Sequence, residues 1–149
     1  MSVLYIGVIG HYPPSRFDEE KACHLLNDAF DNVITDHPDA DEVWVVSRHV
    51  DAGISAIAYR IARERHRNEE YRSWHTMGIT RAHAPEYPLF DVDVSRIIGD
   101  EEDQGSGILL AAIDVLVRIG TSKQLLEETE AFAAMRGNDR VYAYELAAF

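Results

Sequence analysis

Near its start the chain reads Val3-Leu4-Tyr5-Ile6-Gly7-Val8-Ile9, and this stretch decides the fold class. A run of apolar and small residues, rich in Val and Ile, predicts a strand that is buried on both faces, as in a parallel sheet. The next segment, 10–15, holds two prolines and is expected to be a loop. Ser15 and Asp18 resemble a capping box, so the spacing predicts a helix over 16–30.

Short apolar runs and longer helical patterns then alternate along the rest of the chain. Further strands are expected at 43–46, 74–80, 95–98, 114–119 and 141–146, and connections at 31–40 and 81–94. Helices are expected at 105–113, at 122–135 and from 54 onward, the last with its inward face over 54–62 and its end in the charged stretch 63–70. The helix over 122–135 is expected to bury Leu125, Leu126, Thr129 and Phe132. This alternation predicts an α/β fold: a Rossmann-like, doubly wound, mostly parallel sheet of five or six strands with helices on both faces, in one domain over 1–149.

Composition and charge exclude several classes of protein. With 149 residues, 46% hydrophobic and 27% charged, the chain suits one folded domain rather than a disordered protein. Its net charge of −12 repels phosphate backbones, which argues against nucleic-acid binding. The single Cys23 cannot form an intrachain disulfide, and the histidines show no metal-ligand spacing, so we expect no metal and no cofactor. Without a basic signal region or an apolar run of about 18 residues, we expect a cytoplasmic protein that contacts no membrane.

Three turns lie where the ligand of an open parallel sheet is expected, beyond the carboxyl ends of the strands. They read Gly7-Val8-Ile9-Gly10-His11, Ser47-Arg48-His49-Val50-Asp51-Ala52-Gly53 and Gly120-Thr121-Ser122-Lys123-Gln124. Glycine lets a backbone approach a ligand, and free N–H groups at a helix start attract phosphate or carboxylate. The candidate ligand-binding residues are therefore Gly7, Gly10, His11, Ser47, Arg48, His49, Asp51, Gly53, Gly120, Thr121, Ser122, Lys123 and Gln124.

Other interpretations of these residues stay open. Gly7 and Gly10 do not form the GxGxxG fingerprint of dinucleotide binding, and they also suit tight packing of a strand against a helix. No Walker A motif is present, which argues against P-loop nucleotide hydrolysis. Lys123 and Glu128 are candidates for the site, but both residue types are also common on solvated helix faces.

The order and spacing of the three turns resemble the SLOG superfamily. It includes the Lonely-guy cytokinin-activating hydrolases, the lysine-decarboxylase-like proteins and the DprA/Smf DNA-processing proteins. Gly120, Gln124 and Glu128 match the first glycine, the glutamine and the closing glutamate of the family's late turn, whereas Thr121 and Ser122 replace two of its glycines. The resemblance implies a domain that binds or senses a nucleotide or nucleotide-derived small ligand, and a homo-oligomer such as a dimer.

The resemblance also implies two enzymatic alternatives. One is a phosphoribohydrolase that cleaves the N-glycosidic bond of a nucleoside monophosphate, with Glu128 as its catalytic residue, and the other is a deoxyribosyltransferase-like enzyme. The hydrolytic Lonely-guy members pair the late glutamate with an arginine from a Met-x-x-Arg-Lys segment. The corresponding stretch here, 99–106, is acidic and holds no arginine, so Glu128 is expected to lack a positive partner unless Arg96 or Arg118 reaches it. We therefore expect ligand binding with weak or absent hydrolysis.

Overall fold

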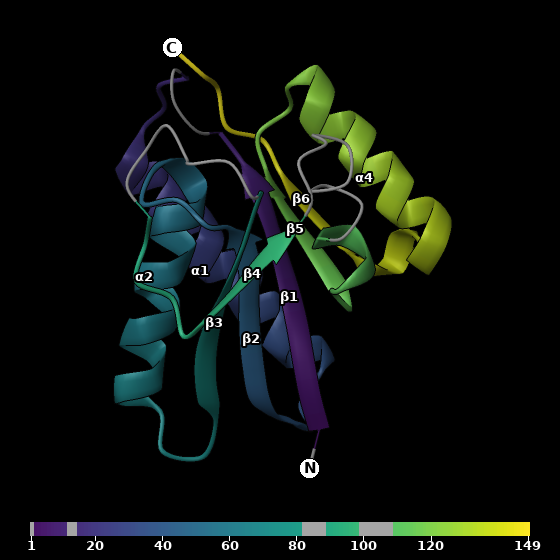
Figure 1. Ribbon diagram of the computed structural model, residues 1–149. Coiled ribbons are helices and arrows are strands. Elements are labelled where there is room, and N and C mark those ends of the chain that lie inside the picture. Colours follow the sequence, from purple (N-terminus) through teal and green to yellow (C-terminus); the bar gives the residue numbers. More distant parts are fainter. Residues whose placement is uncertain (1, 12–14, 82–88, 99–108) are drawn as a thin grey trace.

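A computed structural model describes residues 2–11, 15–81, 89–98 and 109–149 (Figure 1). Within these ranges one six-stranded sheet has the order β4-β3-β2-β1-β5-β6, and every neighbouring pair is parallel. The strands are β1 (Ser2–Gly10), β2 (Ala40–Arg48), β3 (Ser73–Arg81), β4 (Val94–Ile98), β5 (Val115–Ile119) and β6 (Val141–Tyr144). The predicted doubly wound α/β fold is confirmed, with a sheet that is wholly rather than mostly parallel.

Helices cover both faces of the sheet. Figure 1 shows α1 (Glu19–Asp36) and α2 (Gly53–Asn68) together on one side and α4 (Lys123–Arg136) on the other. A helical stretch at 109–111 precedes β5, and a short 3₁₀ helix, η1 (Asn138–Arg140), precedes β6. Among the described residues, no helix combines the length and the apolar character needed to cross a membrane.

The apolar runs of the strands supply two cores, one on each face. Val115, Val117 and Ile119 of β5 belong to the cluster beneath α1 and α2, whereas Leu116 belongs to the cluster beneath α4. Successive side chains of a strand point to opposite faces, so a strand buried on both sides must be apolar at nearly every position. This requirement explains why β1, β2 and β5 were recognisable as uninterrupted apolar runs.

The start of α1 differs from the expectation. The helix begins at Glu19, and its N-cap is Asp18, whose side chain accepts a hydrogen bond from the N–H of Lys21. The predicted capping box led by Ser15 is therefore wrong, since Asp18 fills the N-cap position itself. The helix also continues to Asp36 beyond the predicted end at residue 30, because Val33 is fully buried in the core and extends its apolar face.

The rotation of α4 about its axis also differs from the expectation. Leu125 and Phe132 are buried as predicted, but Leu126 is exposed and Glu128 is buried. Residues three and four apart share a helix face, so the face that carries Leu125 also carries Glu128. The predicted helix over 105–113 is described only from 109 onward, and its first four residues lie outside the described ranges.

Candidate functional site

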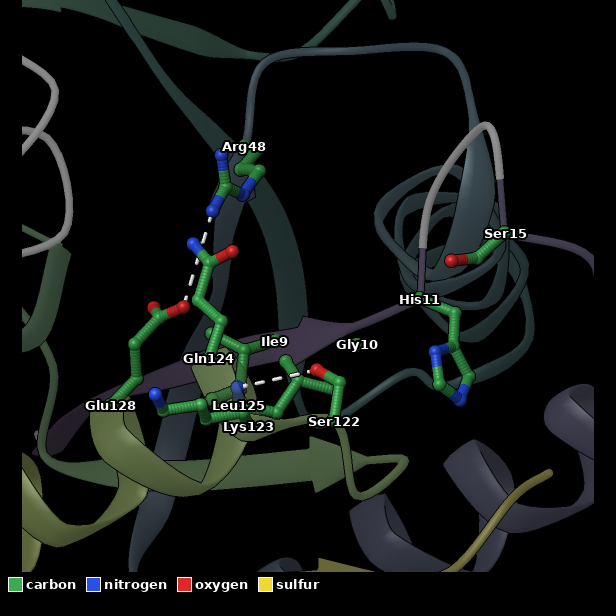
Figure 2. Close-up of a pocket in the computed structure, with 10 residues that line it drawn as sticks. All are labelled: Ile9, Gly10, His11, Ser15, Arg48, Ser122, Lys123, Gln124, Leu125 and Glu128. Carbon is green, nitrogen blue, oxygen red and sulfur yellow. Dashed lines mark hydrogen bonds and ion pairs between the residues drawn. The ribbon is translucent and has the colours of Figure 1, made fainter. Parts of the chain in front are cut away.

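The strand order places one pocket at the point where the direction of chain winding reverses. From β1 the sheet extends through β2 on one side and through β5 on the other. Beyond the carboxyl ends of these strands lies a pocket of about 390 Å³, within the range of small-molecule sites (Figure 2). Its lining residues are Ile9, Gly10, His11, Ser15, Arg48, Ser122, Lys123, Gln124, Leu125 and Glu128.

The amino-terminal end of α4 forms one wall of the pocket. Ser122 is the N-cap, and its hydroxyl oxygen accepts a long hydrogen bond of 3.4 Å from the N–H of Leu125. The N–H of Leu126 makes the first bond of the helix, 3.0 Å to the carbonyl of Ser122. The N–H groups of Lys123 and Gln124 therefore precede the helical ladder, at the end of the helix that carries partial positive charge. Such an end can donate hydrogen bonds to an anion.

Arg48 and Glu128 meet across the pocket. Their Nη2 and Oε1 atoms lie 4.0 Å apart, and the glutamate side chain is only 10% exposed whereas the arginine is 33% exposed. Gln124 lines the same pocket, and Figure 2 marks the ion pair between Arg48 and Glu128 with a dashed line. The expectation that Glu128 lacks an arginine is therefore wrong: β2 supplies the arginine, whereas the segment 99–106 on which that expectation depended lies outside the described residues.

The backbone that carries Arg48 is held from below by α2. The hydroxyl of Tyr59 donates a hydrogen bond of 2.7 Å to the carbonyl of Arg48, and burial raises the pKa of this phenol far above its usual range. The hydroxyl of the preceding Ser47 donates to the carbonyl of Val8 at 2.6 Å and lies 2.7 Å from the hydroxyl of Ser55. These buried bonds hold the end of β2 against β1 and α2. The side chain of Arg48 therefore extends into the pocket from a rigid backbone.

His11 forms the wall opposite α4. Its ring is buried, with Nε2 at 2.8 Å from the carbonyl oxygen of Leu146. Gly120 has φ +115°, and a Cβ on it would lie 2.6 Å from this Nε2. A side chain at position 120 would therefore be strained and would also displace the histidine.

Several predicted site residues line the pocket together, and others do not. Those that line it are Gly10, His11, Arg48, Ser122, Lys123, Gln124 and Glu128. Gly7 lies inside β1, where a Cβ would be 2.2 Å from Cδ1 of Ile113, so this glycine serves packing. Gly10 lines the pocket and also serves packing, because a Cβ there would lie 2.5 Å from Cγ1 of Ile54 in α2.

The last residue of β2, Arg48, lines the pocket, whereas the predicted residues of the turn that follows make their contacts elsewhere. His49 folds back over Gly78, with Nε2 at 2.8 Å from the carbonyl of Phe90 and Nδ1 at 3.0 Å from the hydroxyl of Ser95. Asp51 pairs with an arginine of α2, and Gly53 begins that helix with φ +62°. In the last turn, Gly120 makes room for His11, and Thr121 is exposed.

Three lining residues were missed by the sequence prediction: Ile9, Ser15 and Leu125. The sequence pattern predicts Ser15 as a helix cap, but α1 begins only at Glu19, so Ser15 stays in the loop that precedes the helix and lines the pocket. The apolar character of Ile9 and Leu125 predicts core residues, and both do belong to the cluster beneath α4. No group of three or more His, Cys, Asp or Glu side chains placed to hold a metal ion occurs among the described residues.

Comparison of sequences finds no relative: no protein-family model matches the chain, and no curated protein sequence matches it significantly. Comparison of folds finds solved structures that are similar to this one. The molybdenum cofactor binding protein of Rippkaea orientalis aligns with a TM-score of 0.58 and 16% identity, over 98% of this chain and 91% of that one. The molybdenum cofactor carrier protein of Chlamydomonas reinhardtii aligns with a TM-score of 0.51 and 15% identity, over 97% and 91%. At these identities, the similarity to both proteins is a similarity of fold alone.

Proposed function

We propose that this protein binds a nucleotide or nucleotide-derived small molecule in the pocket above β1 and β5, with the ligand's phosphate at the start of α4. The observation that carries the proposal is the position of the α4 N-terminus. Its first N–H groups, at Lys123 and Gln124, open into a pocket at the reversal point of a parallel sheet.

The charges of the lining agree with a phosphate ligand. The whole chain carries −12, yet the pocket is lined by two cationic side chains, Arg48 and Lys123, and one anionic side chain, Glu128. The guanidinium of Arg48 lines the pocket 4.0 Å from the carboxylate of Glu128, and a guanidinium is a side chain that binds phosphate with paired hydrogen bonds. A local positive region on an acidic protein favours a small anion and still opposes a long polyanion.

The similar folds suggest a particular compound for the test. Two solved structures that this chain resembles are described as a binding protein and a carrier protein of the molybdenum cofactor. Together with the residue pattern that resembles the SLOG superfamily, this likeness supports a role in binding, carrying or sensing a ligand. The molybdenum cofactor therefore belongs in the ligand panel beside the nucleoside phosphates.

A second candidate function is hydrolysis of the N-glycosidic bond of a nucleoside monophosphate, and the Arg48–Glu128 pair favours it. A buried carboxylate in the pocket can stabilise the positive charge that develops on a sugar ring when this bond breaks. The guanidinium beside it can hold a phosphate. A deoxyribosyltransferase-like reaction would use the same carboxylate as a nucleophile.

A panel measured by thermal shift and by chromatography tests both functions. The panel contains nucleosides, their monophosphates, inorganic phosphate and the molybdenum cofactor. Binding raises the melting temperature, so we expect the phosphorylated compounds to raise it more than the nucleosides do. The binding proposal fails if no phosphorylated compound changes the melting temperature at millimolar concentration. Steady release of free base that disappears in Glu128→Gln would establish the hydrolase.

A further inference from the structure

The pocket wall opposite α4 holds a histidine, and one hydrogen bond identifies which of its ring nitrogens carries the hydrogen in the neutral ring. His11 is 7% exposed, and its Nε2 lies 2.8 Å from the carbonyl oxygen of Leu146. A carbonyl oxygen can only accept a hydrogen bond, so Nε2 carries the ring hydrogen. In the neutral ring Nδ1 then bears a lone pair and is a hydrogen-bond acceptor.

Neighbouring residues keep the ring in this orientation. The absence of a side chain at Gly120 leaves the space that Nε2 occupies, and the ring of Phe17 lies against the imidazole with centroids 5.9 Å apart. The segment that offers the Leu146 carbonyl is itself tied down, because the N–H of Phe149 donates to the carbonyl of Arg16 at 2.7 Å. A ring held on several sides presents one fixed edge to a ligand, which is the condition for selective recognition.

That edge is the Nδ1 edge, and it faces the pocket. Figure 2 shows it turned towards Ser122, across the hollow above Gly10. Among the described residues Nδ1 has no hydrogen-bond partner. We infer that Nδ1 of His11 accepts a hydrogen bond from an uncharged donor of the ligand, a hydroxyl or a ring N–H, so that the pocket selects phosphate compounds that carry such a donor. The inference rests on the proposed function and adds the second group that the ligand must have.

The two walls of the pocket would then bind different parts of the ligand. The start of α4 offers N–H donors and suits the phosphate, whereas a lone pair at Nδ1 repels phosphate oxygens and suits a donor. A site built around a buried acceptor rejects analogues that lack the matching donor, because the acceptor is then left unpaired. Inorganic phosphate satisfies only one of the two walls.

Calorimetric titration with guanosine 5′-monophosphate and two analogues tests the inference. The 2′,3′-dideoxy analogue lacks the ribose hydroxyls, and the N1-methyl analogue lacks the ring N–H of guanine. We expect one of the two to bind roughly 2- to 12-fold more weakly than the parent, the range for one neutral hydrogen bond, and the weaker one identifies the donor. Equal affinity for all three, with binding of phosphate compounds intact, overturns the inference alone. Failure of every phosphorylated compound to bind defeats the proposed function as well.

Two substitutions separate recognition from support of the fold. In His11→Phe the difference between parent and analogue should vanish, whereas in His11→Gln it should persist, since a glutamine amide can donate to Leu146 and still offer an oxygen to the pocket. His37→Phe is the matched control, because His37 also lies against a backbone carbonyl, 3.0 Å from that of Val33, but outside the pocket lining. We expect it to leave all three affinities unchanged.

A measurement on the unsubstituted protein covers the case in which His11→Phe does not fold. Nitrogen-15 NMR of the imidazole rings distinguishes a hydrogen on Nε2 from one on Nδ1. We expect the Nε2-protonated form for His11 in the free protein and a change of the Nδ1 resonance when guanosine 5′-monophosphate is added. A hydrogen on Nδ1 in the free protein would overturn the inference.

Discussion

Arg48 and Glu128 are 80 positions apart in the sequence, yet their side chains face each other across one pocket, with Nη2 and Oε1 separated by 4.0 Å. The arginine ends β2 and the glutamate lies one turn into α4, so the pair spans the two halves of the sheet on either side of β1. The pair places a phosphate-binding type of side chain beside a buried carboxylate. Both proposed functions depend on this arrangement.

Replacing Arg48 should weaken ligand binding more than it affects folding. Arg48→Ala removes a charged donor, so we expect the affinity for nucleoside monophosphates to fall by roughly 1.5–3 kcal/mol, the range for a hydrogen bond to a charged group. The free energy of unfolding should change by less than about 1 kcal/mol, because the ion pair is partly exposed. Calorimetry and urea unfolding measure the two effects. Arg60→Ala breaks the exposed pair with Asp51 and serves as the control, and an unchanged affinity in Arg48→Ala would show that the arginine does not contact the ligand.

Alanine substitutions at two glycines with positive φ distinguish the effect of backbone strain from the effect of a changed pocket. Gly120 has φ +115° and Gly137 has φ +101°, so alanine at either position should lower the free energy of unfolding by about 1–3 kcal/mol. Only at Gly120 would the new Cβ meet the ring of His11, at 2.6 Å, whereas at Gly137 it would meet the mobile carboxylate of Asp139. Gly120→Ala should therefore also weaken ligand binding. Equal affinities in the two variants would argue against a role for His11 in the pocket.

The interior glycine of β1 should be replaceable only at a cost in packing. A Cβ at Gly7 would lie 2.2 Å from Cδ1 and 2.9 Å from Cγ2 of Ile113, so Gly7→Ala should destabilise the protein by about 1–3 kcal/mol. Ile113→Ala should cost about 2–5 kcal/mol by itself, and the double variant less than the sum, because each change relieves the other. Urea unfolding of the four proteins gives the coupling energy. Strict additivity would mean that the strand moves away from the helical stretch that precedes β5.

Stability should fall at alkaline pH because two tyrosines resist ionisation in the folded state. Burial raises the pKa of Tyr59, and burial together with a hydrogen bond to the carboxylate of Asp36 raises that of Tyr142. Unfolded tyrosine ionises near pH 10, so above that pH the unfolded chain loses protons that the folded chain keeps, and the free energy of unfolding decreases. The full contribution is present below pH 10. The buried Tyr59 removes at most about 1.4 kcal/mol per pH unit above it, and the more exposed Tyr142 removes less because solvent screens its contacts.

The variants Tyr59→Phe and Tyr142→Phe measure these contributions. Denaturant unfolding between pH 9 and 11.5 should show a shallower decline in each variant than in the unsubstituted protein. The exposed Tyr71→Phe is a control that should leave the slope unchanged. The larger effect is expected for Tyr59, whose hydroxyl is buried against the carbonyls of Arg48 and Met77. A slope that is the same in all four proteins would contradict the assignment.

The strands and their parallel arrangement could be predicted from the sequence because burial on both faces leaves an uninterrupted apolar run, as in β1. The limits of α1 could not, since Ser15 and Asp18 are both good N-cap residues and only packing decides between them. The burial of Glu128 also escaped prediction. Its helix carries Leu125 and Leu126 side by side, and either could have marked the inner face.

The candidate site could be predicted in its outline but not in its contacts. Turns at the carboxyl ends of strands are the expected location in any open parallel sheet, so the turns after β1 and β5 were correctly brought together. The directions of single side chains were not predictable. At the end of β2, Arg48 points into the pocket, whereas the next residue, His49, folds back over Gly78.

The central claim is that the start of α4 holds the phosphate of a small ligand in the pocket above β1 and β5, and an NMR titration of backbone amides tests it most directly. Guanosine 5′-monophosphate and inorganic phosphate would be added to nitrogen-15-labelled protein. We expect the largest, saturable shifts at the amides of Lys123 and Gln124, and smaller shifts for guanosine at the same concentrations. No saturable shift at these amides, or larger shifts at residues outside the pocket, would contradict the claim.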